Sequence, residues 1–220
     1  ALFYEAMLPA MSAAFTASFT SHLLGLEKFS VSFSDTFSVN PQTIAKLILI
    51  AIVFGITGGA FSYFLAFAKE KLAKFIKNPY RRIFFTGIIL SILFLLLWKG
   101  EKVYVFDFLL KAVFTIVTLA AGFQGGEVTP LFSIGATLGV ILASALGLPV
   151  LLVAGLGYAA VFGSATNTLI APILIGVEVF GPEHVVWFVI ICMIAFACNG
   201  NKTIYGKQRL SKMSDFNRIK

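Results

Sequence analysis

The residues best suited to chemistry lie in the stretch Gly122–Gly139, where one long apolar segment ends and the next begins. Between the two segments stand a glycine cluster, the carboxylate of Glu127 and the hydroxyl of Thr129, followed at once by Pro130. Proline is favoured in the first turn of a helix because it has no N–H to leave unsatisfied. Glycines let the backbone approach a ligand closely. The stretch therefore predicts a helix N-terminus whose amides and positive dipole end form an anion site.

Glu127 is the main candidate for proton chemistry, because a carboxylate within a membrane segment is a functional hypothesis by default. The alternative is an acid that caps the helix, favoured by the same dipole. At an anion-binding helix end, the carboxylate would compete with the anion for the amides and would exchange a proton as anions come and go. Thr129 and Tyr205 are hydroxyl donors that could replace the water of a small hydrated anion. The alternative for Tyr205 is an anchor at the membrane interface.

A catalytic interpretation finds little support. His22 and His184 lie in no metalloprotease pattern, and the chain has no nucleophile elbow and no phosphate-binding glycine-rich loop ending in Lys-Ser/Thr. Cys192 and Cys198 lack the closely spaced Cys/His partners of a zinc site, so we expect both in the core. We therefore expect no cofactor, no metal site and no enzymatic activity.

Other charged residues of the apolar segments are expected to be structural. Asp107 and Lys111 are four residues apart, the spacing of a pair on one helix face. Glu178 precedes Gly-Pro near a helix end, and Glu5 lies near the start of an apolar segment. For all of them, a local structural role is favoured over a place on an ion path.

The composition indicates an integral membrane protein. The 220 residues are 59% hydrophobic and 12% charged, about half the charged fraction of a soluble domain. The long apolar segments have helical length, and the alternating pattern of a membrane barrel is absent. Two groups contain most of the basic residues: Lys69, Lys71, Lys74, Lys77, Arg81 and Arg82, and Lys202, Lys207, Arg209, Lys212, Arg218 and Lys220. The positive-inside rule places both in the cytoplasm, an interpretation favoured over nucleic-acid binding.

The apolar segments divide into long and short ones. Residues 44–68 are long enough to span the bilayer and are expected to continue as a helix into the basic stretch, until Asn78-Pro79 ends it. The short segments 150–162 and 169–180 are separated by polar backbone at 163–168. Pairs of short, interrupted segments are typical of transporters, whose binding sites lie at the broken helix ends.

Gly126-Glu127-Val128-Thr129-Pro130 resembles a motif in the second half of the CLC family of chloride channels and proton-coupled anion antiporters. That motif is Gly-x-Phe-x-Pro at a helix N-terminus, and Val128 here stands where Phe is usual. With Gly125, the stretch looks like the fluoride/proton antiporter branch. Further segments match in chain order: residues 1–7 (the end of the first half), 155–160 with 171–178 (a late pair of short helices) and 201–205 (the segment with the central tyrosine).

This resemblance implies an all-α, polytopic membrane protein with the CLC-type inverted-repeat fold, in which broken and re-entrant helices meet. The chain would be the second half of that fold. Residues 1–26 would end the first-half helices, 27–43 would form an external loop, and 44–220 would form the second-half transmembrane repeat with a cytoplasmic C-terminal tail. The family forms homodimers with one pathway per subunit, here expected in the lipid bilayer of a bacterial plasma membrane.

The resemblance also implies the site and the substrates. The anion would bind at Gly126, at the amides of Glu127 and Val128, at Thr129, and at the Tyr205 hydroxyl. Glu127 would couple fluoride to protons, and the protein would export fluoride by antiport. The internal proton-transfer glutamate of chloride antiporters would fall at Ala6, which is consistent with the fluoride branch. The alternative in the family is a chloride channel or chloride/proton antiporter, and outside it a membrane-embedded enzyme or structural subunit.

Overall fold

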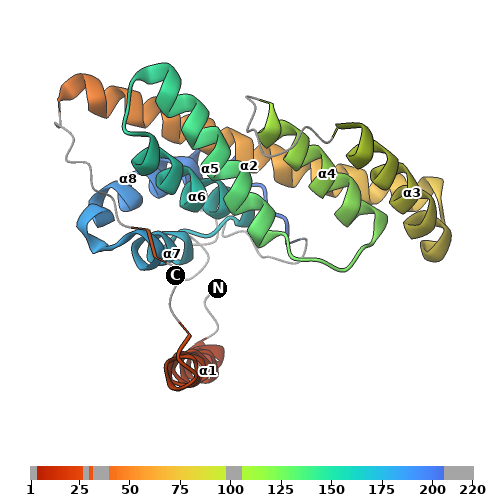
Figure 1. Cartoon of the computed structure of the whole chain (residues 1–220), viewed down its shortest axis with the longest axis horizontal. Coiled ribbons are helices and arrows are strands. Elements are labelled where there is room, and N and C mark those ends of the chain that lie inside the picture. The colour runs from red at the N-terminus through yellow and green to blue at the C-terminus, as the bar shows by residue number, and fades with distance from the viewer. Residues whose placement is uncertain (1–3, 27–29, 32–39, 98–105, 206–220) are drawn as a thin grey trace, which may run out of the picture.

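The computed structural model describes residues 4–26, 30–31, 40–97 and 106–205, and within these ranges every regular element is a helix (Figure 1). The elements are α1 (Tyr4–Leu23), α2 (Pro41–Phe75), α3 (Pro79–Leu97), α4 (Asp107–Ala121), α5 (Val128–Leu146), α6 (Val150–Thr166), α7 (Ile170–Phe180), the short 3-10 helix η1 (Pro182–His184) and α8 (Val185–Ala197). Most of the expected external loop 27–43 and the whole expected tail 206–220 lie outside the described residues. The all-helical prediction is confirmed.

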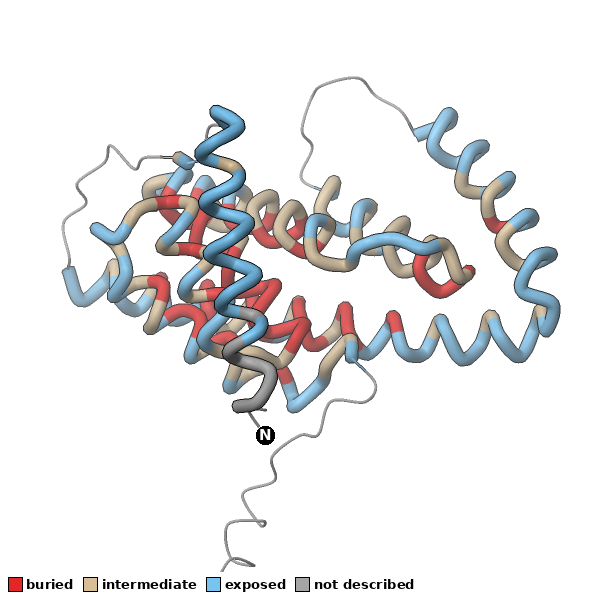
Figure 2. The backbone as a smooth tube through the Cα atoms, turned by 90° about the horizontal axis from the view of Figure 1, so that it is seen from below, coloured by how far each residue is buried: buried red, intermediate tan, exposed pale blue. Residues whose placement is uncertain are grey.

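The long helix α2 connects the core to the basic end of the molecule. It begins at Pro41, inside the expected loop 27–43 and three residues before the predicted start at residue 44. It ends at Phe75, shortly before Asn78-Pro79, as the sequence predicts. Its 35 residues correspond to about 52 Å, well beyond the thickness of a hydrocarbon core. Buried residues run from Leu47 to Leu65, and the last turns are mostly exposed (Figure 2).

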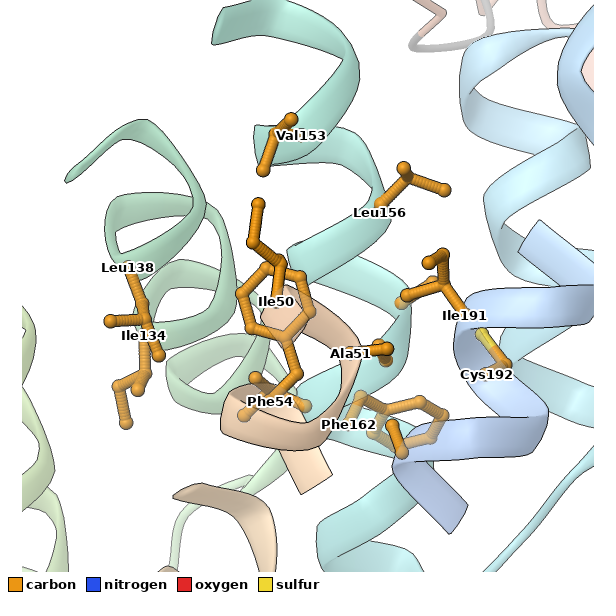
Figure 3. Close-up of a cluster of buried hydrophobic side chains, with 14 of the residues drawn as sticks. Ile50, Ala51, Phe54, Ile134, Leu138, Val153, Leu156, Phe162, Ile191 and Cys192 are labelled. Atoms are coloured by element: carbon orange, nitrogen blue, oxygen red, sulfur yellow. The ribbon is translucent and has the colours of Figure 1, made fainter. Parts of the chain in front are cut away.

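The core lies where α2 meets α5, α6 and α8. Figure 3 shows side chains from all four helices converging: Ile50 and Phe54 from α2, Ile134 from α5, Leu156 from α6 and Ile191 from α8. All five are at most 1% exposed. Burial of each such side chain contributes roughly 1.5–3 kcal/mol, so this cluster fixes the helices that carry the polar site described below.

Glycines and small hydroxyl residues set the helix crossings. An ideal Cβ on Gly157 of α6 would lie 2.3 Å from the carbonyl oxygen of Gly135 on α5, so these two backbones touch. On the other side of α6, Ser164 Oγ donates to the Gly55 carbonyl of α2 at 2.7 Å. Small residues permit such close packing of helices in a membrane.

The C-terminal end of α6 corrects one prediction. Residues 163–166 continue the helix instead of interrupting it, and the break is confined to the turn at Asn167 and the two residues after it. The hydroxyls do not compete with the helix, because they bond to carbonyls: Thr166 Oγ1 donates to Phe162 O at 2.8 Å, and Ser164 donates across to α2. Asn167 ends the helix in the left-handed conformation with φ of 53°.

Three described helices are long and apolar enough to cross a membrane: α2, α3 and α5. Helices α6 and α7 are shorter, as the sequence predicts for a transporter with broken helices. Helix α3 is exposed along most of its length, and α1 lies apart from the other helices (Figures 1 and 2). These apolar, exposed faces are compatible with lipid or further protein and not with water.

Candidate anion-binding site

A side chain of α3, Arg82, holds the break between α4 and α5 in place. Helix α4 ends at Ala121, and Gly122 follows in the left-handed conformation with φ of 99°. Arg82 Nε donates to the Ala121 carbonyl oxygen at 2.8 Å. A cation at a helix C-terminus satisfies a carbonyl and interacts favourably with the dipole. Arg82, interpreted from the sequence as a topology signal, therefore fixes the start of the glycine cluster.

Helix α5 begins at Val128, two residues before Pro130, so the proline lies in the first turn as expected. The amide of Leu131 donates to the Glu127 carbonyl at 3.3 Å and is the first to be satisfied inside the helix. Pro130 has no N–H, and the amides of Val128 and Thr129 precede Leu131, the first residue whose N–H donates to a carbonyl of the helix. Two amides are thus available at the positive end of α5, next to Gly126, which is exposed and has open space at its Cβ position.

The Glu127 side chain does not cap α5. Its backbone is helical, with φ of −77° and ψ of −21°, and it makes no side-chain capping hydrogen bond. Its carboxylate instead faces α2, where Lys69 Nζ lies 3.7 Å from Oε1. The Glu127 side chain is 25% exposed, so the carboxylate is partly withdrawn from water. The carboxylate therefore makes no capping hydrogen bond to α5 and pairs with Lys69 instead.

Tyr205 is positioned by the C-terminal end of α6. The Ile204 amide donates to the Ala165 carbonyl at 3.0 Å, and Thr203 Oγ1 donates to the Thr166 carbonyl at 3.3 Å. The same threonine oxygen accepts the amide of Tyr205 at 3.1 Å. These bonds fix the backbone on both sides of the tyrosine, which is 45% exposed.

Asn199 joins the segment before Tyr205 to the end of α6, and no pattern in the sequence predicts this role. Its side chain is buried, and its amide nitrogen donates to the Ser164 carbonyl at 3.0 Å and to Asn167 Oδ1 at 2.8 Å. Its amide oxygen accepts the Asn201 backbone N–H at 2.7 Å. One side chain therefore joins the end of α6 to the turn that leads to Tyr205. An Asn-Gly pair after an apolar segment signals a turn but not such a network.

We expect Asn199→Ala to lower the stability of the protein by about 1–3 kcal/mol, because it leaves buried polar groups without partners. Thermal unfolding in detergent measures the effect. Asn40→Ala is the matched control: its side chain is exposed and makes no capping hydrogen bond, and its φ of −103° suits alanine, so the same truncation is expected to change little. Equal losses for both variants would contradict the role of Asn199.

Tyr205 and Glu127 lie close enough to interact electrostatically. Burial raises the pKa of the Tyr205 hydroxyl, and the negative charge of Glu127 raises it further. The phenol therefore stays protonated at neutral pH and can donate a hydrogen bond. The structure thus brings together the N-terminus of α5 and Tyr205, while Thr129 lies exposed in the first turn of α5. Within the described residues, no three His, Cys, Asp or Glu side chains gather in a group that could hold a metal.

The family model for the voltage-gated chloride channel matches residues 1–200. The chain belongs to the voltage-gated chloride channel, or CLC, family. It is 34% identical over 233 aligned residues to a chloride/fluoride channel protein of Pseudomonas syringae pv. tomato, covering 94% of this chain and 50% of the relative. The chain thus spans about half the length of the curated relative that it matches.

Solved structures agree with this family. The chain superimposes on the crystal structure of a CLC-type fluoride/proton antiporter with a TM-score of 0.89 and 44% identity, over 94% of this chain and 57% of the other. A slow cyanobacterial chloride/proton antiporter gives a TM-score of 0.59 at 18% identity, over 74% and 47% of the two chains, which shows the shared fold alone. The predicted CLC fold and the resemblance to the fluoride/proton antiporter branch are confirmed.

Proposed function

We propose that the protein exports fluoride across the membrane in exchange for protons. The observation that carries the proposal is the N-terminus of α5, where two amides at a positive helix end follow directly on Glu127, whose carboxylate makes no capping hydrogen bond. The negative charge of Glu127 in turn acts on the hydroxyl of Tyr205. The similarity to a CLC-type fluoride/proton antiporter supports the choice of ion. The family is one of transporters, which favours transport over an enzyme or a structural subunit.

In this mechanism, fluoride exchanges its hydration shell for the backbone at Gly126, the amides of Glu127 and Val128, and the hydroxyls of Thr129 and Tyr205. Backbone and hydroxyl donors suit a small anion that must lose water to enter. Glu127 binds a proton at its carboxylate when the anion arrives and releases it when the anion leaves, because two negative charges at one helix end repel each other. We place the site in the plasma membrane of a bacterium, in a homodimer, with the chain's C-terminal end in the cytoplasm.

The alternative is chloride, carried by a channel or by a chloride/proton antiporter of the same fold. The test is efflux from liposomes that contain the full-length protein and are loaded with fluoride or with chloride. An ion-selective electrode and a pH electrode follow the anion and the proton together. Fluoride efflux with coupled proton uptake supports the proposal. Fast chloride efflux without proton movement would establish a chloride channel instead.

Removal of the Tyr205 hydroxyl is expected to weaken fluoride binding. A hydrogen bond to a charged partner contributes about 1.5–3 kcal/mol, so Tyr205→Phe should weaken the affinity about tenfold or more. Isothermal titration with fluoride at neutral pH measures this change. The control is Tyr63→Phe, which removes an exposed hydroxyl from α2. Unchanged affinity in Tyr205→Phe would remove this residue from the site.

A further inference from the structure

The ion pair between Lys69 and Glu127 is not accounted for by the anion site itself. Lys69 is one of six basic residues at the end of α2 and the start of α3, and the positive-inside rule alone would explain its presence. Its neighbours have other partners: Lys74 pairs with Glu70 on the same helix, and Lys71 lies 5.6 Å from the centre of the Phe67 ring. Within the described residues, only Lys69 of this group reaches Glu127.

The geometry of α2 explains how Lys69 reaches the site. Lys69 follows Ser62 by seven residues, or two helical turns, so both lie on the same face of α2. Ser62 Oγ donates to the Ala165 carbonyl at 2.8 Å, the same oxygen that accepts the Ile204 amide beside Tyr205. One face of α2 therefore contacts Glu127 through Lys69 and, through Ser62, the α6 carbonyl to which the Tyr205 segment also bonds.

A second lysine fixes α2 against the opposite end of α5. Lys46 Nζ donates to the Leu146 carbonyl, in the last turn of α5, at 2.7 Å. The two helices thus run antiparallel, and each end of α5 faces a lysine of α2. At the C-terminal end the contact is a short hydrogen bond to backbone. At the N-terminal end it is a longer contact of 3.7 Å between partly exposed charges, which can break and form again.

We propose that Lys69 is a positioning residue for proton coupling: it holds the ionised Glu127 carboxylate toward α2 and releases it when the carboxylate takes a proton. This inference rests on the proposed antiport. The proton binds a carboxylate oxygen, and Lys69 keeps its own hydrogens and its charge throughout. The titratable groups that face Glu127 in the described structure are Lys69 from α2 and Tyr205 from the segment after α8. Tyr205 stays neutral at physiological pH, so Lys69 supplies the local positive charge.

The direction of the effect follows from electrostatics. A nearby cation favours the ionised carboxylate, so its removal makes protonation easier and moves the pH profile of transport upward. Partly exposed ion pairs are weak, so the expected shift of the transport profile is about a few tenths of a pH unit. The side chains here are 43% and 25% exposed, so we expect a shift within this range.

The test measures coupled fluoride and proton flux against pH for the full-length protein in liposomes. We expect Lys69→Gln to move the half-maximal pH upward by a few tenths of a unit, and Lys69→Arg to restore the wild-type profile. Lys74→Gln is the matched control, since it makes the same charge change on the same helix and breaks the pair with Glu70. In a Glu127→Gln background, which is expected to lose coupling, Lys69→Gln should leave the rate of fluoride flux unchanged, because its partner is already absent.

The outcomes separate the two proposals. If the wild-type protein shows no coupled fluoride and proton flux, the proposed antiport fails and this inference fails with it. If the wild-type protein is coupled but Lys69→Gln has the wild-type profile, the inference alone is overturned. An equal shift in Lys74→Gln would also overturn it, because the effect would then come from the general positive charge of α2.

Discussion

Glu127→Gln is expected to uncouple fluoride from protons. Glutamine keeps the shape of the side chain and can still form hydrogen bonds, but it cannot bind and release a proton. Because Glu127 makes no capping bond, the substitution should leave the start of α5 intact. We expect proton uptake per fluoride to fall toward zero, because the amide has no group that titrates. Simultaneous recording of fluoride and pH in liposomes gives the ratio directly.

The control for this variant is Glu70→Gln. Glu70 is also a carboxylate paired with a lysine, Lys74, and it is exposed on α2. Both substitutions remove one negative charge from the same end of the molecule. Glu70→Gln should leave the ratio of protons to fluoride unchanged. A Glu127→Gln protein with wild-type rate and ratio would show that the carboxylate has no part in coupling.

The predictable part of this structure depends on local signals. The start of α5 follows from a glycine cluster and Pro130, and the end of α2 follows from Asn78-Pro79. In both places a proline restricts the backbone of its own residue and of the residue before it. The same local reasoning failed at Ser164 and Thr166. Hydroxyl residues favour turns only when their side chains bond to the nearby backbone outside a helix, and here they bond to carbonyls of α6 and α2.

The contacts that complete the site join residues far apart in the chain. Nothing in the sequence around Lys69 distinguishes it from the other lysines of α2, and its role depends on how α2 crosses α5. Asn199 likewise reads as a turn residue until α6 is placed beside it. Such contacts depend on helix packing, which is governed by shape and close approach more than by local propensity.

Gly157→Ala is expected to disrupt the packing on which the whole site depends. A Cβ at this position would meet the Gly135 carbonyl oxygen at 2.3 Å and the Phe54 ring at 2.8 Å. Since the first contact is with backbone, the clash is relieved only if α5 and α6 separate, and the core side chains of Figure 3 separate with them. Overpacking usually costs about 1–3 kcal/mol, and we expect at least the upper end here because backbone cannot rotate away.

Gly87→Ala on α3 is the matched control for this substitution. Both glycines are helical, so each variant gains about 1 kcal/mol of helix propensity, and only the contacts differ. A Cβ on Gly87 would meet only the tip of the Phe123 ring, at 3.3 Å. We expect Gly87→Ala to be as stable as the wild type in thermal unfolding and Gly157→Ala to yield little folded protein on gel filtration. Equal behaviour would mean that the helices tolerate separation, and that α6 does not position the Tyr205 segment through this crossing.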